Sequence, residues 1–438
     1  MAYTDFTEAG LSRRSLLRGG AALAGGGMLA GLPFGSALLA HHDVSEGWPT
    51  VAAEIDKYLR EKKVANMLAT FGWRQEEHAH SVGGGTLALG GSTQVDQDSL
   101  YRIYSMTKPI TGMMAMQLIS EGKIGLDQPL SDILPAFANM QVQKEYDGAI
   151  TEDNLEPAAN PITIRQMLTH TAGLGYGIIQ KGAIKDEYDR LGLVGGQVSR
   201  LPIPGVANPT PAPSLEAFAD SLATLPLVYQ PGTRWSYSVG LDLMGRVIEV
   251  VEGKPFDTVL QERMFGPAGM KSTFFTVPKS DIGRFTTNYA VFSGQLIPID
   301  PAASSIYLDQ PAFPYGGGGL VSSPYDYDRF LRMLLGKGMI DGTRVLSEAA
   351  VNVGTSNILP STVDTTGSWA EGQGFGAGGR VVGKAYGWGG AAGTAAVVDF
   401  ERGLRAQLFT QYMPSEAYPI QGKFSELVQA DLAARPNG

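Results

Sequence analysis

The sequence contains no cysteine, which excludes thiolate nucleophiles, cysteine-ligated zinc and disulfide bonds. Basic residues are also in the minority, because 34 Lys and Arg stand against 43 Asp and Glu, giving a net charge of −9. Phosphate backbones are bound by basic surfaces, so this balance argues against nucleic acid as a partner. Histidine is scarce as well, with 5 in the whole chain. A Ser-His-Asp triad therefore has few candidates for its base.

Two signatures of other enzyme classes are missing. The pentapeptide Gly-x-Ser-x-Gly, which carries the nucleophile of α/β-hydrolases, does not occur in the sequence. The glycines of Gly316–Gly319 could suggest a phosphate-binding loop, but no Gly-Lys-Ser/Thr follows them. A glycine-rich turn before the strand-like Leu320-Val321-Ser322 is the better interpretation.

The N-terminus carries paired arginines followed by a weakly hydrophobic run. Ser12-Arg13-Arg14-Ser15 precedes a stretch rich in Gly, Ala and Leu that extends from Gly19 to Ala40. This pattern resembles a twin-arginine export signal of bacteria, with a cut near Ala37 or Ala40. An uncleaved membrane anchor is the alternative, but the glycines and Pro33 favour cleavage. We therefore expect residues 1–40 to be an export signal and the mature protein, without stable membrane insertion, to be periplasmic or secreted.

The remaining chain is long enough for one two-lobed domain or for two domains, with 43% hydrophobic residues to form a core. Apolar spacing predicts a helix over residues 49–62, and then a hairpin of the strands Val64–Trp73 and Gly85–Leu89. The connection contains Glu76-Glu77-His78-Ala79-His80. These side chains could ligate a metal, but alternate residues at a solvent-facing strand end are the simpler interpretation, and we expect no metal.

The middle of the chain differs in character from its two ends. From about residue 131 to 287, helical patterns alternate with long loops, and Thr163-Ile164-Arg165-Gln166 has the form of a capping box. Short strands and glycine clusters return afterwards, with a hairpin over 394–400 and 405–412. We expect an α+β domain over 45–438, with a sheet lobe (about 45–130 and 288–438) and an inserted helical lobe (about 131–287).

Ser105-Met106-Thr107-Lys108 lies where a strand-like run changes into a helical one. Positions i and i+3 share one face of a helix, so the Lys108 amine can reach the Ser105 hydroxyl. The first turn of a helix also has unpaired N–H donors and favours developing negative charge. This layout is typical of a serine nucleophile with a neighbouring base, but a single Ser-x-x-Lys also occurs by chance.

Two further stretches carry groups that fit beside this pair. In Trp235-Ser236-Tyr237-Ser238-Val239, the phenol of Tyr237 could transfer protons, although a packed tyrosine at a helix start is also possible. In Trp388-Gly389-Gly390-Ala391, the glycines allow close approach to a substrate and offer backbone N–H donors, or they form a bulge. His170, in Thr169-His170-Thr171-Ala172-Gly173-Leu174, is the best-placed histidine, and we favour a packing role for it.

Together, Ser-Met-Thr-Lys, His-Thr-Ala-Gly-Leu, Pro-Gly-x-x-Trp-x-Tyr-Ser and Trp-Gly-Gly resemble the serine β-lactamase/penicillin-binding-protein superfamily. The resemblance covers nearly all of the chain after residue 40 and is nearest to the class C-like branch with the family VIII carboxylesterases. It implies a mainly antiparallel sheet flanked by helices, a helical lobe beside it, and an active site in the cleft between them.

The resemblance also assigns roles to individual residues. Ser105 matches the nucleophile, Lys108 the base that activates it, and Tyr237 the tyrosine that shares proton transfer. The backbone N–H groups of Ser105 and Ala391 would form the oxyanion hole. No metal or organic cofactor is implied.

Two departures from the superfamily pattern concern the substrate. Trp388, Gly389 and Gly390 stand where β-lactamases and peptidases carry Lys-Thr-Gly, and Val239 replaces the asparagine of Tyr-x-Asn. The site thereby loses carboxylate and amide recognition and gains an apolar wall. We expect an exported carboxylesterase that cleaves uncharged acyl esters, with a small-molecule ester or amide as its substrate. A β-lactamase or D-Ala-directed peptidase, an acyltransferase, and a penicilloyl-binding sensor without turnover remain the alternatives.

Overall fold

A seven-stranded antiparallel sheet organises the fold, which a computed structural model describes for residues 47–203 and 208–435. The predicted export signal lies outside the described residues. The strand order is β11-β12-β13-β14-β15-β1-β2. The strand bounds are β1 Asn66–Trp73, β2 His80–Gly85, β11 Gly374–Phe375, β12 Arg380–Val382, β13 Ala385–Gly389, β14 Ala395–Asp399 and β15 Leu404–Phe409.

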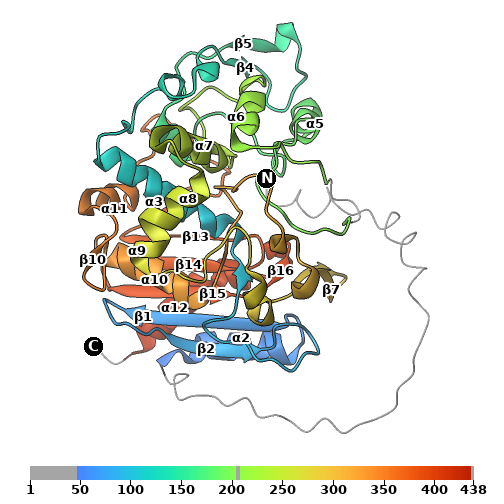
Figure 1. The fold of residues 1–438 in the computed structure, drawn as a ribbon, viewed down its shortest axis with the longest axis vertical. Helices are drawn as coiled ribbons and strands as arrows, with labels where there is room; N and C mark the ends of the chain where they lie inside the picture. The colour runs from blue at the N-terminus through green and yellow to red at the C-terminus, as the bar shows by residue number, and fades with distance from the viewer. Residues whose placement is uncertain (1–46, 204–207, 436–438) are drawn as a thin grey trace, which may run out of the picture.

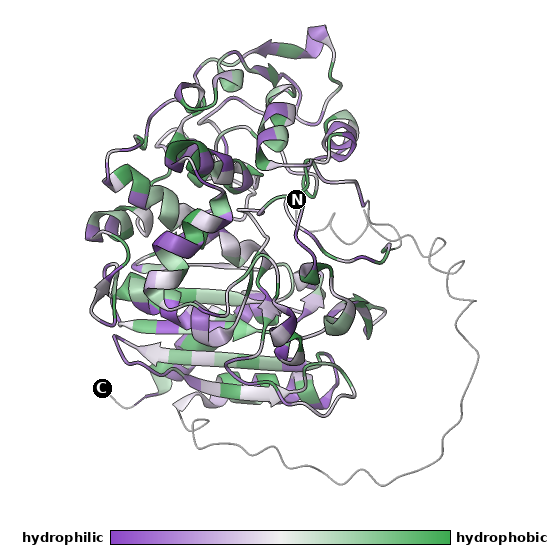
Figure 2. Cartoon of the chain, viewed as in Figure 1, coloured by the Kyte–Doolittle hydropathy of each residue, from purple (hydrophilic) through white to green (hydrophobic). Residues whose placement is uncertain are grey.

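The two ends of the chain meet in this sheet. β1 pairs with β15 over Leu68↔Phe409 to Trp73↔Leu404, so blue and red strands lie side by side (Figure 1). Hydrophobic residues recur along the strands of the sheet (Figure 2). The predicted hairpin near residues 394–412 is confirmed as β14 and β15. The predicted fold class, an antiparallel sheet flanked by helices, is confirmed as well.

The second strand of the first hairpin was predicted wrongly as Gly85–Leu89. The strand is β2, which pairs with β1 from Phe71↔His80 to Asn66↔Gly85. Gly83 and Gly85 have positive φ, and a Cβ at Gly83 would overlap the carbonyl oxygen of Met67. The glycines here let the two backbones approach closely. In the sequence alone, the same glycines suggest a turn.

Helices cover both faces of the sheet. On one face, α2 (Pro49–Arg60) and α12 (Ile420–Ala434) enclose a core in which Trp48 stacks on Phe71 at 3.8 Å. On the other face, α10 (Pro324–Leu335) packs on β14 and β15. Next to it, α3 (Thr107–Ser120) packs against α11 (Glu348–Gly354) and α7 (Gly240–Glu252).

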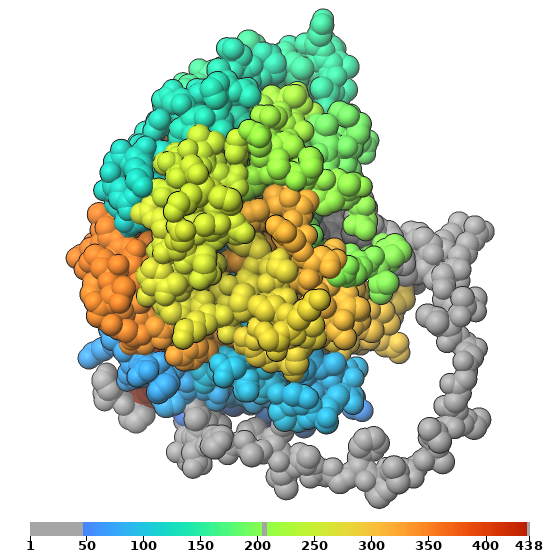
Figure 3. Space-filling view, in the orientation of Figure 1, coloured from blue at the N-terminus to red at the C-terminus, as the bar shows by residue number. Residues whose placement is uncertain are grey.

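The remaining helices lie mostly above the sheet in Figure 1. The capping box of Thr163 and Gln166 is confirmed at the start of the short helix α4. In Figure 3, green residues form the top of the molecule and blue residues the bottom, with yellow and orange segments between them. The predicted lobe limits stay a prediction. The helix bounds are α4 Ile164–Leu168, α5 Gly182–Arg190, α6 Leu215–Ala223, α8 Phe256–Leu260 and α9 Gly266–Ala268, with a π-helical turn Gln261–Phe265 between the last two.

Short strand pairs complete the fold. β3 directly precedes the predicted nucleophile and pairs with β8, which follows the Gly316–Gly319 turn. The bounds of these strands are β3 Tyr101–Arg102, β4 Gln141–Gln143, β5 Leu155–Pro157, β6 Asn288–Phe292, β7 Gln295–Asp300, β8 Val321–Ser322, β9 Met339–Ile340, β10 Thr343–Arg344 and β16 Tyr412–Met413.

Two further observations concern residues 47–203 and 208–435 only. None of their helices combines the length and apolar character needed to cross a bilayer. No three His, Asp or Glu side chains among them gather as ligands of a metal ion would. His78 and His80, the candidates considered above, are both exposed.

Candidate active site

Ser105 lies in a single 3₁₀ turn, Tyr104–Met106, that leads directly into α3. The Nζ of Lys108 is 3.4 Å from the Oγ of Ser105 and donates a hydrogen bond of 2.6 Å to the carbonyl of Gly317. Lys108 has no exposed surface, whereas Ser105 is partly exposed. The structure thus brings the two predicted residues together, with the amine in the interior and the hydroxyl at its boundary.

The backbone before Ser105 adopts an unusual conformation. Tyr104 has φ of 40°, in the left-handed region that residues with a Cβ rarely adopt. Its ring is buried, and Asn288 Nδ2 donates to its hydroxyl at 3.1 Å. Strained dihedrals persist where surrounding contacts fix them, and they are typical of functional sites. Here the bend places Ser105 in the turn that leads into α3.

Tyr237 lies beside the pair, as predicted. The Nζ of Lys108 is 4.6 Å from the centroid of its ring, and the side chain is 4% exposed. Trp388 Nε1 donates a hydrogen bond of 3.2 Å to the Tyr237 hydroxyl. Trp369, which sequence reasoning missed, packs on the same ring at 5.0 Å. The Tyr237 ring therefore lies against the Lys108 amine, and its hydroxyl oxygen accepts the indole N–H of Trp388.

His170 packs behind Tyr237, with ring centroids 4.7 Å apart. Its Nδ1 lies 2.9 Å from Ser238 Oγ and accepts the Ser238 backbone N–H at 3.2 Å. Burial, and secondarily the charge of Lys108, lowers the pKa of His170 well below its ordinary value. A neutral, fully buried imidazole with these contacts agrees with the packing role predicted for it.

The glycine-rich end of β13 approaches the nucleophile from another side. A Cβ at Gly390 would overlap the carbonyl of Ile103, two residues before Ser105. Gln421 Nε2 donates 2.7 Å hydrogen bonds to the carbonyls of Gly390 and Thr394 and holds this bend in place. Gly389 and Ala391 flank Gly390 and are partly exposed. The oxyanion hole of Ser105 and Ala391 stays a prediction.

Val239 is placed differently from the wall residue that we predicted. Val239 directly precedes α7, and its side chain has no exposed surface. Its backbone N–H donates to the carbonyl of Gly175. In this conformation it offers no surface to a substrate, whereas Trp388 is partly exposed. Trp388 is therefore the better-supported part of the predicted apolar wall.

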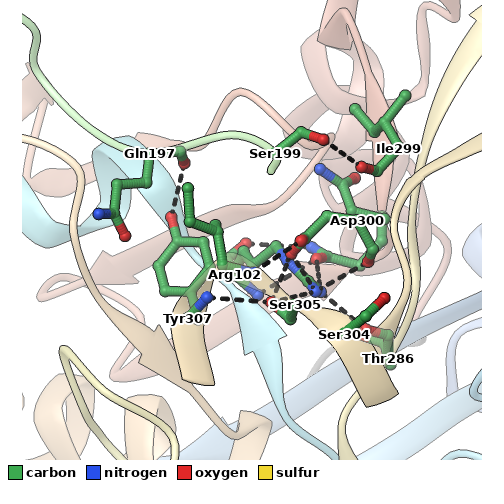
Figure 4. Close-up of polar contacts among 12 residues, drawn as sticks. Arg102, Gln197, Ser199, Thr286, Ile299, Asp300, Ser304, Ser305 and Tyr307 are labelled. Atoms are coloured by element: carbon green, nitrogen blue, oxygen red, sulfur yellow. Dashed lines mark hydrogen bonds and ion pairs between the residues drawn. The ribbon is translucent and has the colours of Figure 1, made fainter. Parts of the chain in front are cut away.

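Arg102 in β3 is the second buried cation near the nucleophile, and sequence reasoning missed it. Its side chain has no exposed surface and pairs with Asp300, with Nε and Nη2 at 2.7 and 2.5 Å from Oδ2 (Figure 4). The other groups that contact the Arg102 side chain come from several distant segments of the chain. They are Thr286, Ser305 and Gln411, which accept hydrogen bonds, and Phe285, whose ring lies 4.0 Å from the guanidinium carbon.

The same network holds a surface loop. Tyr307 donates a 3.0 Å hydrogen bond to the carbonyl of Gln197, and Ser199 Oγ bonds the carbonyl of Ile299 (Figure 4). Arg102 was visible in the sequence only as one charge within an apolar run. A buried charge must be paired, but its acid lies 198 positions away in sequence.

The chain is similar to several known proteins. The family model described as Beta-lactamase matches residues 51–430. Protein Rv1367c of Mycobacterium tuberculosis is 35% identical over 284 residues, 65% of this chain and 66% of that protein, just under two thirds of its length. Esterase EstB of Burkholderia gladioli is 28% identical over 298 residues, 64% of this chain and 68% of EstB. Among solved structures, "EstCE1, a hydrolase with promiscuous acyltransferase activity" has the same fold, with a TM-score of 0.70, 22% identity, and coverage of 89% and 100%.

The Arg102–Asp300 pair generates a stability prediction. Asp300→Ala leaves a fully buried guanidinium without its carboxylate, so we expect the free energy of unfolding to fall by about 3–5 kcal/mol in urea denaturation. Asp309→Ala is the matched control, because it breaks the solvent-exposed pair with Arg200 and should change stability little. Equal effects of the two substitutions would contradict a special role for the buried pair.

The Trp388–Tyr237 contact generates a kinetic prediction. Trp388→Phe keeps an aromatic ring but removes the N–H donor. We expect kcat for an ester to fall about 10-fold, because a hydrogen bond to an oxygen that gains negative charge in the transition state contributes about 1.5 kcal/mol. Trp369→Phe is the control, because the observed contact of Trp369 with Tyr237 is between the rings. A loss of the same size in both variants would show that ring packing alone matters.

Proposed function

The chain belongs to the beta-lactamase family, and from this premise we propose that it is a serine hydrolase that cleaves uncharged carboxylic esters through an acyl-enzyme. The observation that carries the proposal is the 3.4 Å approach of the buried Lys108 amine to the Ser105 hydroxyl. A base within reach of a serine is the arrangement that nucleophilic catalysis requires.

The proposed reaction has two halves. Ser105 Oγ attacks the ester carbonyl while its proton passes to Lys108 or Tyr237, and the backbone N–H groups of Ser105 and Ala391 stabilise the oxyanion. Collapse breaks the bond to the alcohol, which leaves with that proton. Water then attacks the acyl-enzyme by the same proton route and releases the carboxylic acid. Every group that takes part in these reaction steps belongs to the protein, its substrate or water.

The preference for esters over β-lactams has two supports. Trp388 occupies the position where related enzymes carry a lysine that holds a substrate carboxylate, so the site presents an indole instead of a cation. The relative EstB is named an esterase and aligns over 64% of this chain. We therefore place uncharged esters ahead of penicillins and D-Ala-D-Ala peptides, which carry a carboxylate.

The direct test is Ser105→Ala with a short-chain 4-nitrophenyl ester. We expect hydrolysis to fall by at least about 10³-fold, because only binding and oxyanion stabilisation remain without the nucleophile. Ser280→Ala, at an exposed position, is the matched control and should retain the wild-type rate. Retained activity in Ser105→Ala would refute the assignment of the nucleophile.

The same assay separates the alternatives. Turnover of nitrocefin faster than of the ester would indicate a β-lactamase. Capture of the acyl group by an added alcohol would indicate an acyltransferase. A stable mass adduct with a β-lactam, without turnover of either substrate, would indicate a penicilloyl-binding sensor.

We further propose that the chain is exported through its paired arginines. Arg13→Lys combined with Arg14→Lys should keep the protein in the cytoplasm of a bacterial host, because the twin-arginine signal is read at that pair. Cell fractionation with detection of the mature protein measures this. Finding the double variant in the periplasm would contradict the proposal. So would a wild-type periplasmic protein whose N-terminus still lies before Gly19.

A further inference from the structure

Asp242, in the first turn of α7, is linked to Lys108 through one residue of the glycine turn. Its Oδ1 accepts the backbone N–H of Gly317 at 2.8 Å. The carbonyl of the same Gly317 accepts the Lys108 Nζ at 2.6 Å. Gly317 therefore binds the Asp242 carboxylate through its N–H and the Lys108 amine through its carbonyl.

The glycine turn fits tightly between α3 and α7. A Cβ at Gly317 would overlap the carboxylate of Asp242, and a Cβ at Gly316 would overlap the carbonyl of Leu241. Thr111 of α3 donates a 2.7 Å hydrogen bond to the Gly316 carbonyl. Because both flanking helices fix the turn, the direction of the Gly317 carbonyl is set by its neighbours.

The carboxylate is held at a cost in free energy. Asp242 has no exposed surface, and its Oδ2 has no hydrogen-bond partner among the described residues. Burial raises the pKa of Asp242 to about 6, against the opposing effects of the Lys108 charge and the Gly317 N–H. The other titratable groups that face it are Tyr176 and Tyr315, and its charge adds to the effect of burial in raising the pKa of each phenol. A buried carboxylate that contacts the partner of the proposed base is a candidate for a role in the site.

We propose that Asp242 is a positioning residue, which holds the Gly317 peptide so that its carbonyl fixes the Lys108 amine beside Ser105. This inference rests on the function proposed above. A peptide whose N–H is bound by a carboxylate is polarised, so its carbonyl is a stronger acceptor for the lysine. Asp242 itself touches neither the hydroxyl of Ser105 nor, by this proposal, the substrate.

The test compares Asp242→Asn with Asp242→Ala in steady-state ester hydrolysis and in the rate of Ser105 labelling by a fluorophosphonate. Asn keeps an acceptor oxygen for Gly317, so we expect its kcat to stay within about 10-fold of the wild type. Ala leaves the peptide free to turn, so kcat and the labelling rate should fall by about 100-fold with little change in KM, since a misplaced catalytic group costs about that much. Gly317→Ala, which forces the turn away from Asp242, should reproduce the loss.

Asp326→Asn is the matched control. Asp326 also lies in the first turn of a helix, burial also raises its pKa to about 6, and its carboxylate binds Ser272 and Thr273 away from Lys108. This variant should keep its kcat even where its melting temperature falls. Melting curves of all variants establish the folded fraction in each assay.

The outcomes are separable. If the wild type neither hydrolyses esters nor reacts with the fluorophosphonate, the proposed function fails. If the wild type does both, and folded Asp242→Ala matches it, the positioning role is overturned. An Asp242→Asn variant as slow as Asp242→Ala would also overturn it, because the hydrogen bond to Gly317 would then not be what matters.

Discussion

The arrangement of the site depends on one constraint, which is that a lysine amine is kept in the interior next to a serine. A buried amine loses its hydration and must find acceptors or ring faces in the protein. Lys108 finds the Gly317 carbonyl, the Ser105 hydroxyl and the Tyr237 ring. The first of these comes from the turn before β8, the second from the turn before α3, and the third from the segment before α7. The requirement to solvate one amine therefore brings three distant segments together.

A second buried cation, Arg102, connects the strand before the nucleophile to distant parts of the chain. Arg102 lies three residues before Ser105 and joins β3 to Asp300 in β7 and to Gln411 near the C-terminus. Since β3 also pairs with β8, the strand that leads to the nucleophile is fixed on both sides. Two buried cations with different partners thus determine where the short turn Tyr104–Met106 can lie. The strained φ of Tyr104 is maintained by this surrounding structure.

Residues in short motifs could be predicted from the sequence, and residues that act through distant partners could not. Ser105 and Lys108 are three positions apart on one turn, so helical geometry alone brings them close. The capping box at Thr163 and the hairpin β14–β15 are local in the same way. Asp242 and Arg102, by contrast, look like ordinary charges in the sequence, because their burial arises from contacts made much later in the chain. The limits of β2 were missed for a related reason, since paired glycines suggest a turn until their partner strand is known.

The position of Trp388 connects the choice of substrate to the proton-transfer group. A lysine at that position would offer a cation to a substrate carboxylate, but it would also place a second positive charge close to Lys108. The indole offers no charge, and its N–H is directed to the Tyr237 hydroxyl. The same side chain that makes the wall apolar thus also holds the hydroxyl of the proposed proton-transfer group, without attracting an anionic substrate. An uncharged ester suits this arrangement because its binding requires no cation in the cleft, so the position that would hold a substrate carboxylate can instead serve the Tyr237 hydroxyl.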